Sequence, residues 1–222
     1  MAEYGLEIRN LSNIVIIDST YKNHVYHEHG SSSVVQYINE IDIGDLPSSG
    51  LLFIKAPSGI YATSLGFKKN GSVYDKILIA ASGSGTVDWI VFREDRQAEI
   101  PDYGLVVYDG SSQVVFNSNE LGYCNVVYNT QYAISGETTV YITDADNNYF
   151  AYQGGSYSYN YNGTTKYTIR RMVGIKAKGS TSIYLNLFDY ANVYGDHGVG
   201  NSGGAGGRSP NDLIEIQPPY WI

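Results

Sequence analysis

The sequence contains only one cysteine, Cys124, so a disulfide within the chain and a cysteine-rich metal cluster are both excluded. Only 14 residues are Lys or Arg, they form no basic cluster, and the formal net charge is −8. A nucleic-acid-binding protein needs a basic stripe to displace counterions, so that class is set aside. No apolar run approaches the roughly 18 residues that cross a bilayer, and membrane insertion is not expected.

The opening residues, MAEYGLEIRN, carry neither a basic n-region nor an apolar h-region. An ordinary secretion signal has both features, so none is expected here. The protein is accordingly expected to leave the cytoplasm only through lysis or as part of an assembled particle.

Tyrosine and glycine are abundant instead, with 22 and 25 residues, and this bias favours strands and turns because aromatic side chains fit a pleated surface. Hydrophobic residues make up 43% of the chain and charged residues 16%, so a globular fold is expected. Period-two alternation and short apolar runs recur, with turn residues at intervals of roughly 8 to 12 positions, as in sandwiches and barrels. The sequence therefore predicts an all-β protein.

One segment occurs twice, as YGLEIRNLSNIVIIDS at residues 4–19 and as YGLVVYDGSSQVVFNS at residues 103–118. The two copies share six identical residues at one fixed offset, and their polar tetrads NLSN and DGSS align. In each copy apolar residues alternate before the tetrad and an apolar strand follows it, which predicts a β-hairpin. Convergence on common strand residues is the alternative, but duplication explains the shared register better.

The most charged stretch of the chain, REDRQAEIPDY, leads into the second copy and is interpreted as a linker. We place a boundary near residue 99. The sequence thus predicts two tandem β-sandwich-like domains, 1–99 and 100–222, each beginning with a YGL hairpin. The second domain contains tyrosine-rich strands and a glycine-rich loop, residues 195–212.

The hairpin pattern, YGL followed by a turn and then V-[VI]-[FI]-[DN]-S, resembles the opening of a family of uncharacterised tail proteins from tailed bacteriophages. The second copy is the closer match, and the strand VDWIVFRE upstream of it is similar too. The resemblance covers the hairpins and the strands around them, under a quarter of the chain. It implies a virion tail component that assembles with other tail proteins, and it transfers no catalytic residue.

Tyrosines crowd the segment from Tyr152 to Tyr167. Within SYSYNYN, alternation places Tyr157, Tyr159 and Tyr161 on one strand face. Exposed aromatic rows suit stacking on sugar rings or a subunit interface, so all five residues are candidate surface or interface contacts. The alternative is that this face covers the core.

The segment HVYHEHG places His27 and His29 on one face of a strand and His24 on the other. Two imidazoles on one face can chelate a transition metal, but a closed site needs further ligands from an oligomer, for which a trimer is one option. The alternative is a polar strand face at the surface. No cofactor is expected otherwise.

Within loop 195–212, GNSGG resembles the serine-nucleophile stretch of trypsin-like proteases, with Ser202 as the nucleophile. Too few residues follow Ser202 to build a substrate pocket of that fold, and the upstream histidines lack the matching context, so no enzyme is predicted. The segment TDADNNY, with Asp144, Asp146 and Asn148, begins like a calcium loop but lacks the glycine and glutamate of an EF-hand. A turn is expected there.

These observations together predict a non-enzymatic structural or adhesion component of a phage tail, at the tip or in a fibre, located in the virion. It would assemble as a homo-oligomer with other tail proteins, while loop 195–212 meets a host-surface glycan or receptor. A free carbohydrate-binding module with a tyrosine strip is the first alternative. A serine hydrolase using Ser202 is the second.

Overall fold

The computed structural model describes residues 7–9, 15–18, 24–48, 50–93, 105–112, 114–117, 124–132, 134, 136–153, 157–161, 167–194 and 211–218. Strands and short connections make up this part of the chain, and no helix occurs in it, which confirms the all-β class. No described segment is therefore a helix that could cross a membrane.

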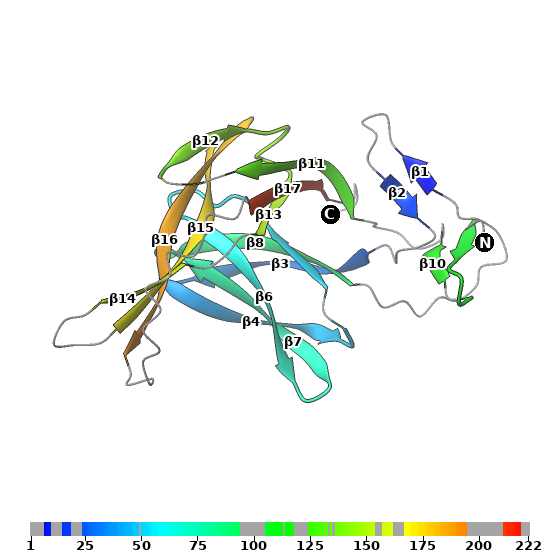
Figure 1. Ribbon diagram of the computed structural model, residues 1–222, viewed down its shortest axis with the longest axis horizontal. Helices are drawn as coiled ribbons and strands as arrows, with labels where there is room; N and C mark the ends of the chain where they lie inside the picture. The colour runs from blue at the N-terminus through cyan, green and yellow to red at the C-terminus, as the bar shows by residue number, and fades with distance from the viewer. Residues whose placement is uncertain are drawn as a thin grey trace.

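Two antiparallel sheets form a sandwich-like arrangement (Figure 1). The six-stranded sheet runs in the order β11 (Asn125–Tyr132), β17 (Asn211–Gln217), β13 (Tyr149–Gln153), β5 (Leu51–Ile54), β8 (Gly85–Arg93) and β3 (Val25–Val34). The seven-stranded sheet runs in the order β12 (Thr138–Tyr141), β16 (Ser182–Tyr194), β15 (Tyr167–Gly179), β6 (Ala62–Asn70), β7 (Val73–Ala81) and β4 (Tyr37–Leu46). Outside this order, β14 (Tyr157–Tyr161) pairs with β15.

In each large sheet, the strands counted inward from one edge correspond one by one to the strands counted inward from the other edge. Strands β3, β8 and β5 of one sheet correspond to β11, β17 and β13, and strands β4, β7 and β6 of the other correspond to β12, β16 and β15. The N-terminal unit, residues 25–93, therefore has the topology of the C-terminal unit, residues 125–217. The units join edge to edge at a seam, where β5 pairs with β13 and β6 pairs with β15.

The backbone register repeats as well as the strand order. The pairing of β3 with β8 and the pairing of β11 with β17 both skip one residue at the same place, so His27 and Val127 are bulged out of their ladders. In consequence Val91 in β8 and Glu215 in β17 occupy equivalent positions. A shared bulge is a specific feature of a ladder, so it supports duplication of the whole unit.

The two copies of the YGL segment form separate two-stranded antiparallel sheets, as predicted. The first joins β1 (Glu7–Arg9) to β2 (Val15–Asp18), and the second joins β9 (Val106–Tyr108) to β10 (Val114–Asn117). Their registers correspond residue by residue, including one bulged residue in each second strand. Both small sheets lie beyond the right-hand end of the sandwich in Figure 1.

The sequence predicted two tandem β-sandwich-like domains, 1–99 and 100–222, and the structure contains two corresponding sets of strands, in residues 25–93 and 125–217. Strands from both halves of the chain combine in both large sheets, so the units share one sandwich. At the seam one backbone pair joins the units in each sheet, Ile54 with Phe150 and Ala62 with Ile175. The predicted boundary near residue 99 lies outside the described residues.

Buried side chains form three main clusters. The cluster between the sheets in the N-terminal unit includes Leu52, Ile54, Ile77, Ile79, Val87 and Val91. Its counterpart in the C-terminal unit includes Phe150, Tyr152, Val173, Ile175, Ile183 and Leu213. The third cluster covers the other face of the six-stranded sheet and includes Phe53, Ile90, Phe92, Tyr149, Ala151 and Ile216.

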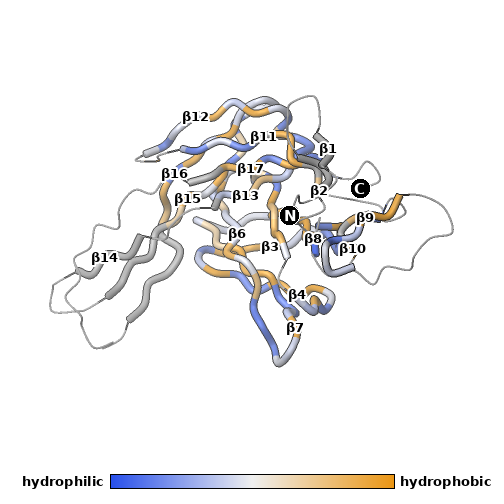
Figure 2. Tube along the Cα trace, turned by 45° about the vertical axis from the view of Figure 1, so that its right-hand side comes forward, coloured by the Kyte–Doolittle hydropathy of each residue, from blue (hydrophilic) through white to orange (hydrophobic). Residues whose placement is uncertain are grey.

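The six-stranded sheet is thus buried on both faces, since alternate side chains of its inner strands enter different clusters. One hydrogen bond joins the residues just before its two edge strands, β11 and β3, where Cys124 N donates to His24 O at 3.1 Å. Figure 2 shows the inner strands as largely hydrophobic and the tip between β6 and β7 as hydrophilic. Burial of each large apolar side chain stabilises the fold by about 1.5–3 kcal/mol.

Candidate binding face

The outer face of the seven-stranded sheet carries a row of polar and aromatic side chains that crosses the seam. Thr139 of β12 lies opposite Tyr184 of β16, which lies opposite Lys176 of β15. Tyr61 continues the row, because β6 and β15 pair one position further on. We call these four residues the Lys–Tyr row. Neighbouring positions on the same strands face the core, so alternation directs the row outward.

Cations and rings alternate in this row. The Nζ atom of Lys176 lies 4.3 Å from the ring centroid of Tyr61 and 4.9 Å from that of Tyr184. The Nζ atom of Lys178, two residues along β15, lies 4.8 Å from the Tyr184 centroid. Such cation–π contacts hold flexible lysines in place, each by about 0.5–1 kcal/mol at an exposed site.

One carboxylate completes the polar network. Glu137 accepts a hydrogen bond from the Tyr61 hydroxyl and forms an ion pair with Lys176, whose Nζ lies 3.5 Å from Glu137 Oε2. The hydrogen bond from Tyr61 lowers the pKa of Glu137. Hydrogen bonding between the Tyr61 side chain and Lys176 raises the pKa of Lys176. Burial raises the pKa of Tyr61, and the bond to Glu137 adds to this. At neutral pH the acid and the base therefore stay charged and act as fixed charges.

Tyr141 stands beside the row on the edge strand β12, two residues beyond Thr139 and so on the same face. Its side chain is 77% exposed, more than any other large hydrophobic residue in the described part of the chain. Lys178 Nζ donates to Thr139 Oγ1 at 2.8 Å, which ties this end of the face to the row. A free ring and an anchored ammonium are thus presented together.

Gly174 shapes the opposite end of the face. A Cβ atom at this position would lie 2.4 Å from Cε1 of Phe188 and 2.9 Å from Cβ of Tyr61, closer than real contacts allow. The missing side chain lets Phe188, which is 7% exposed, lie across β15. The Lys–Tyr row is therefore bordered by the buried side chain of Phe188 on one side and by Tyr141 on the other.

A cavity of about 310 Å³ opens at the same seam. It is bordered by β5 and β6 of the N-terminal unit and by β13 and β15 of the C-terminal unit. Its walls include Leu51, Phe53, Phe67, Tyr152 and Met172. The cavity is mostly apolar and marks where the two units diverge after their short shared pairings.

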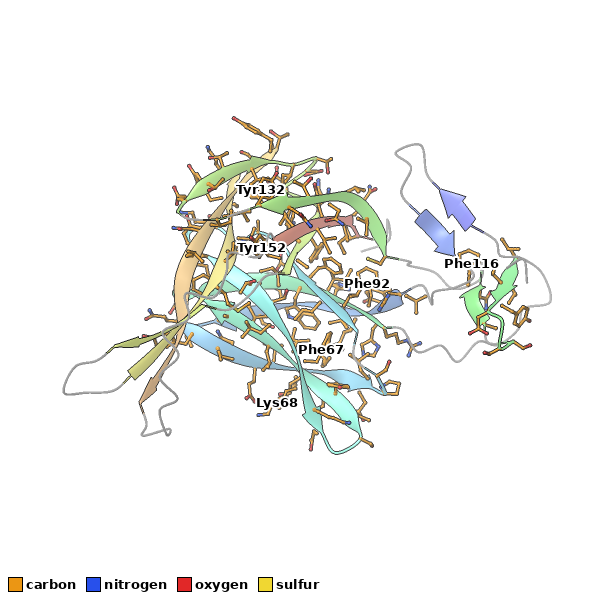
Figure 3. All side chains as sticks on the ribbon, viewed as in Figure 1. Phe67, Lys68, Phe92, Phe116, Tyr132 and Tyr152 are labelled. Atoms are coloured by element: carbon orange, nitrogen blue, oxygen red, sulfur yellow. The ribbon has the colours of Figure 1, made fainter. Side chains whose placement is uncertain are left out.

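The structure moves Tyr152 from the predicted surface to the core. Its side chain is 4% exposed, and its hydroxyl donates to the backbone oxygen of Tyr132 at 3.1 Å, between the layers (Figure 3). The reason is that β13 is a central strand whose even-numbered residues, Phe150 and Tyr152, both face the seven-stranded sheet. A surface contact through Tyr152 is therefore excluded.

The remaining predicted tyrosines lie on the hairpin of β14 and β15. In the backbone pairing, Tyr161 lies opposite Tyr167, Tyr159 opposite Ile169 and Tyr157 opposite Arg171. This hairpin extends away from the sandwich in Figure 1. Their role in surface or interface contact stays a prediction.

The predicted pairing of His27 and His29 on one strand face is wrong. His27 is the bulged residue of β3, and its Nε2 lies 3.1 Å from Gly44 O, while the neighbouring Glu28 accepts from Gly44 N at 2.7 Å. His29 turns to the other face, where its Nδ1 lies 2.7 Å from the hydroxyl of Tyr26. The bulge breaks the alternation on which the prediction relied. No cluster of three or more metal-binding side chains occurs among the described residues.

Sequence reasoning missed a buried carboxylate, Glu215, which is 0% exposed. It accepts hydrogen bonds from Thr143 N and Oγ1, from Asp144 N and from Asn148 Nδ2. The segment considered as a calcium loop is thus a turn fastened to β17. Asp144 also accepts from the side chain of Asn147, which lowers the pKa of Asp144. Only the odd placement of an acid inside the apolar strand DLIEIQ signals this network in the sequence.

Two further predictions concern the glycine-rich loop 195–212 and Cys124. Loop 195–212, apart from its last two residues, lies outside the described residues, and so does Ser202. Cys124 packs beside the third core cluster, and burial raises the pKa of its thiol to about 12, although part of the residue is exposed. Since the thiolate is the nucleophilic form, this favours the interpretation of Cys124 as a packing residue.

Comparison of the chain with protein-family models, with curated proteins and with solved structures finds no match in any of the three. The function must therefore be inferred from the geometry of the chain itself. The Lys–Tyr row and its neighbours Lys178, Glu137 and Tyr141 together offer two anchored cations, one carboxylate and an exposed ring, and this chemistry suits the binding of a partner or ligand.

Proposed function

We propose that the protein is a non-enzymatic structural and adhesion component of a bacteriophage tail, assembled in the virion as a homo-oligomer with other tail proteins. The observation that carries the proposal is the second YGL hairpin, whose residues resemble the opening hairpin of phage tail proteins. It forms a sheet of its own just before the C-terminal unit, residues 125–217.

The exposed residues of this hairpin support an assembly role. Leu105 and Tyr108 are each 44% exposed, whereas Val107 is buried against Phe116. Apolar and aromatic side chains at the surface are enriched at protein interfaces. A hairpin that buries one face on itself and exposes the other provides such a contact for a neighbouring tail protein.

The test is to locate the protein in particles. Virions released by the host that carries the gene are purified by density gradient, and the protein is quantified by mass spectrometry and located by immunogold labelling. We expect label on the tail at a fixed ratio to the other tail proteins. Purified particles without the protein would overturn the proposal.

A free carbohydrate-binding module is the second candidate, and Tyr141 is the observation that favours it. An aromatic side chain that is 77% exposed beside anchored polar groups suits stacking on a sugar ring. Light scattering and saccharide titration of the purified chain separate the two. A stable oligomer found in particles supports the tail component, whereas a saccharide-binding monomer absent from particles supports the module.

A further inference from the structure

The charge of the binding face differs from that of the protein as a whole. The net charge is −8, yet two lysines and one glutamate stand together on this face. Lys176 is paired with Glu137, but none of the ion pairs found among the described residues includes Lys178. The ammonium of Lys178 donates to a neutral hydroxyl, on Thr139, and so keeps its full charge available to an anion.

An aromatic ring stands close to this ammonium. Tyr141 and Gly179 both lie opposite Ser182 of β16, so Tyr141 and Lys178 flank that strand at the same end of the sheet. The Lys178 side chain crosses β16, because its ammonium reaches Thr139, which lies two residues before Tyr141 on β12. Two residues span about 6.8 Å along a strand, so the ammonium lies within reach of a sugar ring stacked on Tyr141. A disaccharide can cover this span, with one ring on Tyr141 and a substituent at Lys178.

From this juxtaposition we propose that the face binds an acidic saccharide, with a pyranose ring stacked on Tyr141 and a carboxylate at the Nζ atom of Lys178. The inference rests on the adhesion role proposed above and names its ligand class. The rings of Tyr61 and Tyr184 are covered by ammonium groups, so Tyr141 supplies the stacking surface. The carboxylate of Glu137 is engaged by the ammonium of Lys176 and the hydroxyl of Tyr61, and this offsets its charge toward a bound carboxylate.

Among the described residues, no tyrosine of the N-terminal unit is as exposed as Tyr141. In the N-terminal unit two lysines of the same sheet are paired with strand neighbours, Lys68 with Glu40 at 2.7 Å and Lys76 with Asp42 at 2.6 Å. The Nζ atom of a third, Lys69, lies 5.8 Å from the ring centroid of Tyr74, which is only partly exposed. The row itself takes Tyr61 from one unit and its other members from the other. One saccharide is therefore expected for each chain.

Isothermal titration at low ionic strength tests the inference, with hexagalacturonate and its fully methyl-esterified form as probes. We expect the acid to bind at one site per chain and the ester to bind at least about tenfold more weakly, because esterification removes the charge that Lys178 contacts. Lys178→Gln and Tyr141→Ala are each expected to weaken binding of the acid by about tenfold or more.

Lys68→Gln is the matched control, since it removes a lysine from the same sheet in the other unit. This variant should bind as the wild type does, and circular dichroism checks that every variant folds. The inference is overturned if wild type binds neither probe, if acid and ester bind equally, or if Lys68→Gln weakens binding as much as Lys178→Gln. A tail protein that binds no acidic saccharide would refute this inference alone, whereas binding by a protein absent from particles would refute only the tail assignment.

Discussion

The two units of the sandwich share their strand order and their bulge but differ in the side chains placed on that frame. In the N-terminal unit Gly30 lies opposite Trp89, and the corresponding pair in the C-terminal unit is Thr130 and Leu213. A very small residue beside a very large one is thus replaced by two of middle size. The same backbone pairing therefore accommodates different side chains when the combined volume of the packed pair is similar.

A second difference concerns polarity. Val91 and Glu215 are both 0% exposed at equivalent positions, one in an apolar cluster and the other in a hydrogen-bonded network. The carboxylate is tolerated because four donors of the segment 143–148 surround it. At this position the C-terminal unit therefore has hydrogen bonds between a turn and a central strand, whereas the N-terminal unit has apolar packing.

The largest expected effect comes from exchanging the residues at these two positions. Val91→Glu places a carboxylate in an apolar cluster, and we expect it to lower the free energy of unfolding by more than about 3 kcal/mol. Glu215→Val leaves its donors without their acceptor and is expected to cost about 3 kcal/mol. Urea denaturation followed by tryptophan fluorescence measures both changes.

Glu215→Gln is the control for this exchange, because it keeps one side-chain oxygen as an acceptor. It should lose less stability than Glu215→Val does. If Glu215→Val were as stable as the wild type, the hydrogen bonds of Glu215 would not stabilise the turn. The inferred difference in polarity between the two units would then have no effect on stability.

A smaller effect is expected from exchanging the packed pair. A Cβ atom at position 30 would lie 2.6 Å from Cζ2 of Trp89, so Gly30→Thr is expected to destabilise the chain by about 2 kcal/mol. Trp89→Leu leaves a cavity and also loses the hydrogen bond from Trp89 Nε1 to Ser32. The double variant reproduces the pair of the C-terminal unit. The loss in free energy of unfolding of the double variant should be smaller, by at least about 1 kcal/mol, than the sum of the losses of the two single variants.

Thermal unfolding of the four proteins of this cycle, monitored by circular dichroism, provides the measurement. Strictly additive losses would mean that the two pairs are not interchangeable solutions of one packing problem. In that case the shared topology would not extend to side-chain volumes.

The smallest effect is expected for the two hairpins. Since their registers and bulges correspond, replacing residues 7–18 by the sequence of residues 106–117 should change the free energy of unfolding by less than about 0.5 kcal/mol. Deleting the bulged Ile16 from the first hairpin is the contrasting variant, because it removes the bulge and converts the pairing of β1 with β2 into a regular ladder. Amide hydrogen exchange of β1 reports on both. Equal exchange in the deletion variant would contradict the role of the bulge.

Much of the fold could be predicted because strands, turns and repeats leave local marks in the sequence. Alternation in segments such as SIYLNLF and the offset between the YGL copies correctly predicted strands and hairpins. The bulge at His27 could not be predicted, since HVYHEHG alternates as a regular strand does and an inserted residue carries no marker of its own. That one residue overturned the predicted metal face.

The binding face was predictable only in part. Lys176 and Tyr184 lie in consecutive strands of one hairpin, so a cross-strand contact could be inferred from KAKG and SIYL. Tyr61 and Thr139 come from distant strands, and only the pairing at the seam brings them into the row. The same holds for Glu215, whose donors lie far from it in sequence.

The seam also bears on how the chain is made. Strands β5 and β6 are synthesised long before their partners β13 and β15, because the partners belong to the second unit. An N-terminal unit that folds early therefore holds two open strand edges side by side until the second unit arrives. A nascent neighbour of the same sequence offers strands of the matching kind, so slow synthesis or truncation after the first unit would favour exchange of whole units between chains.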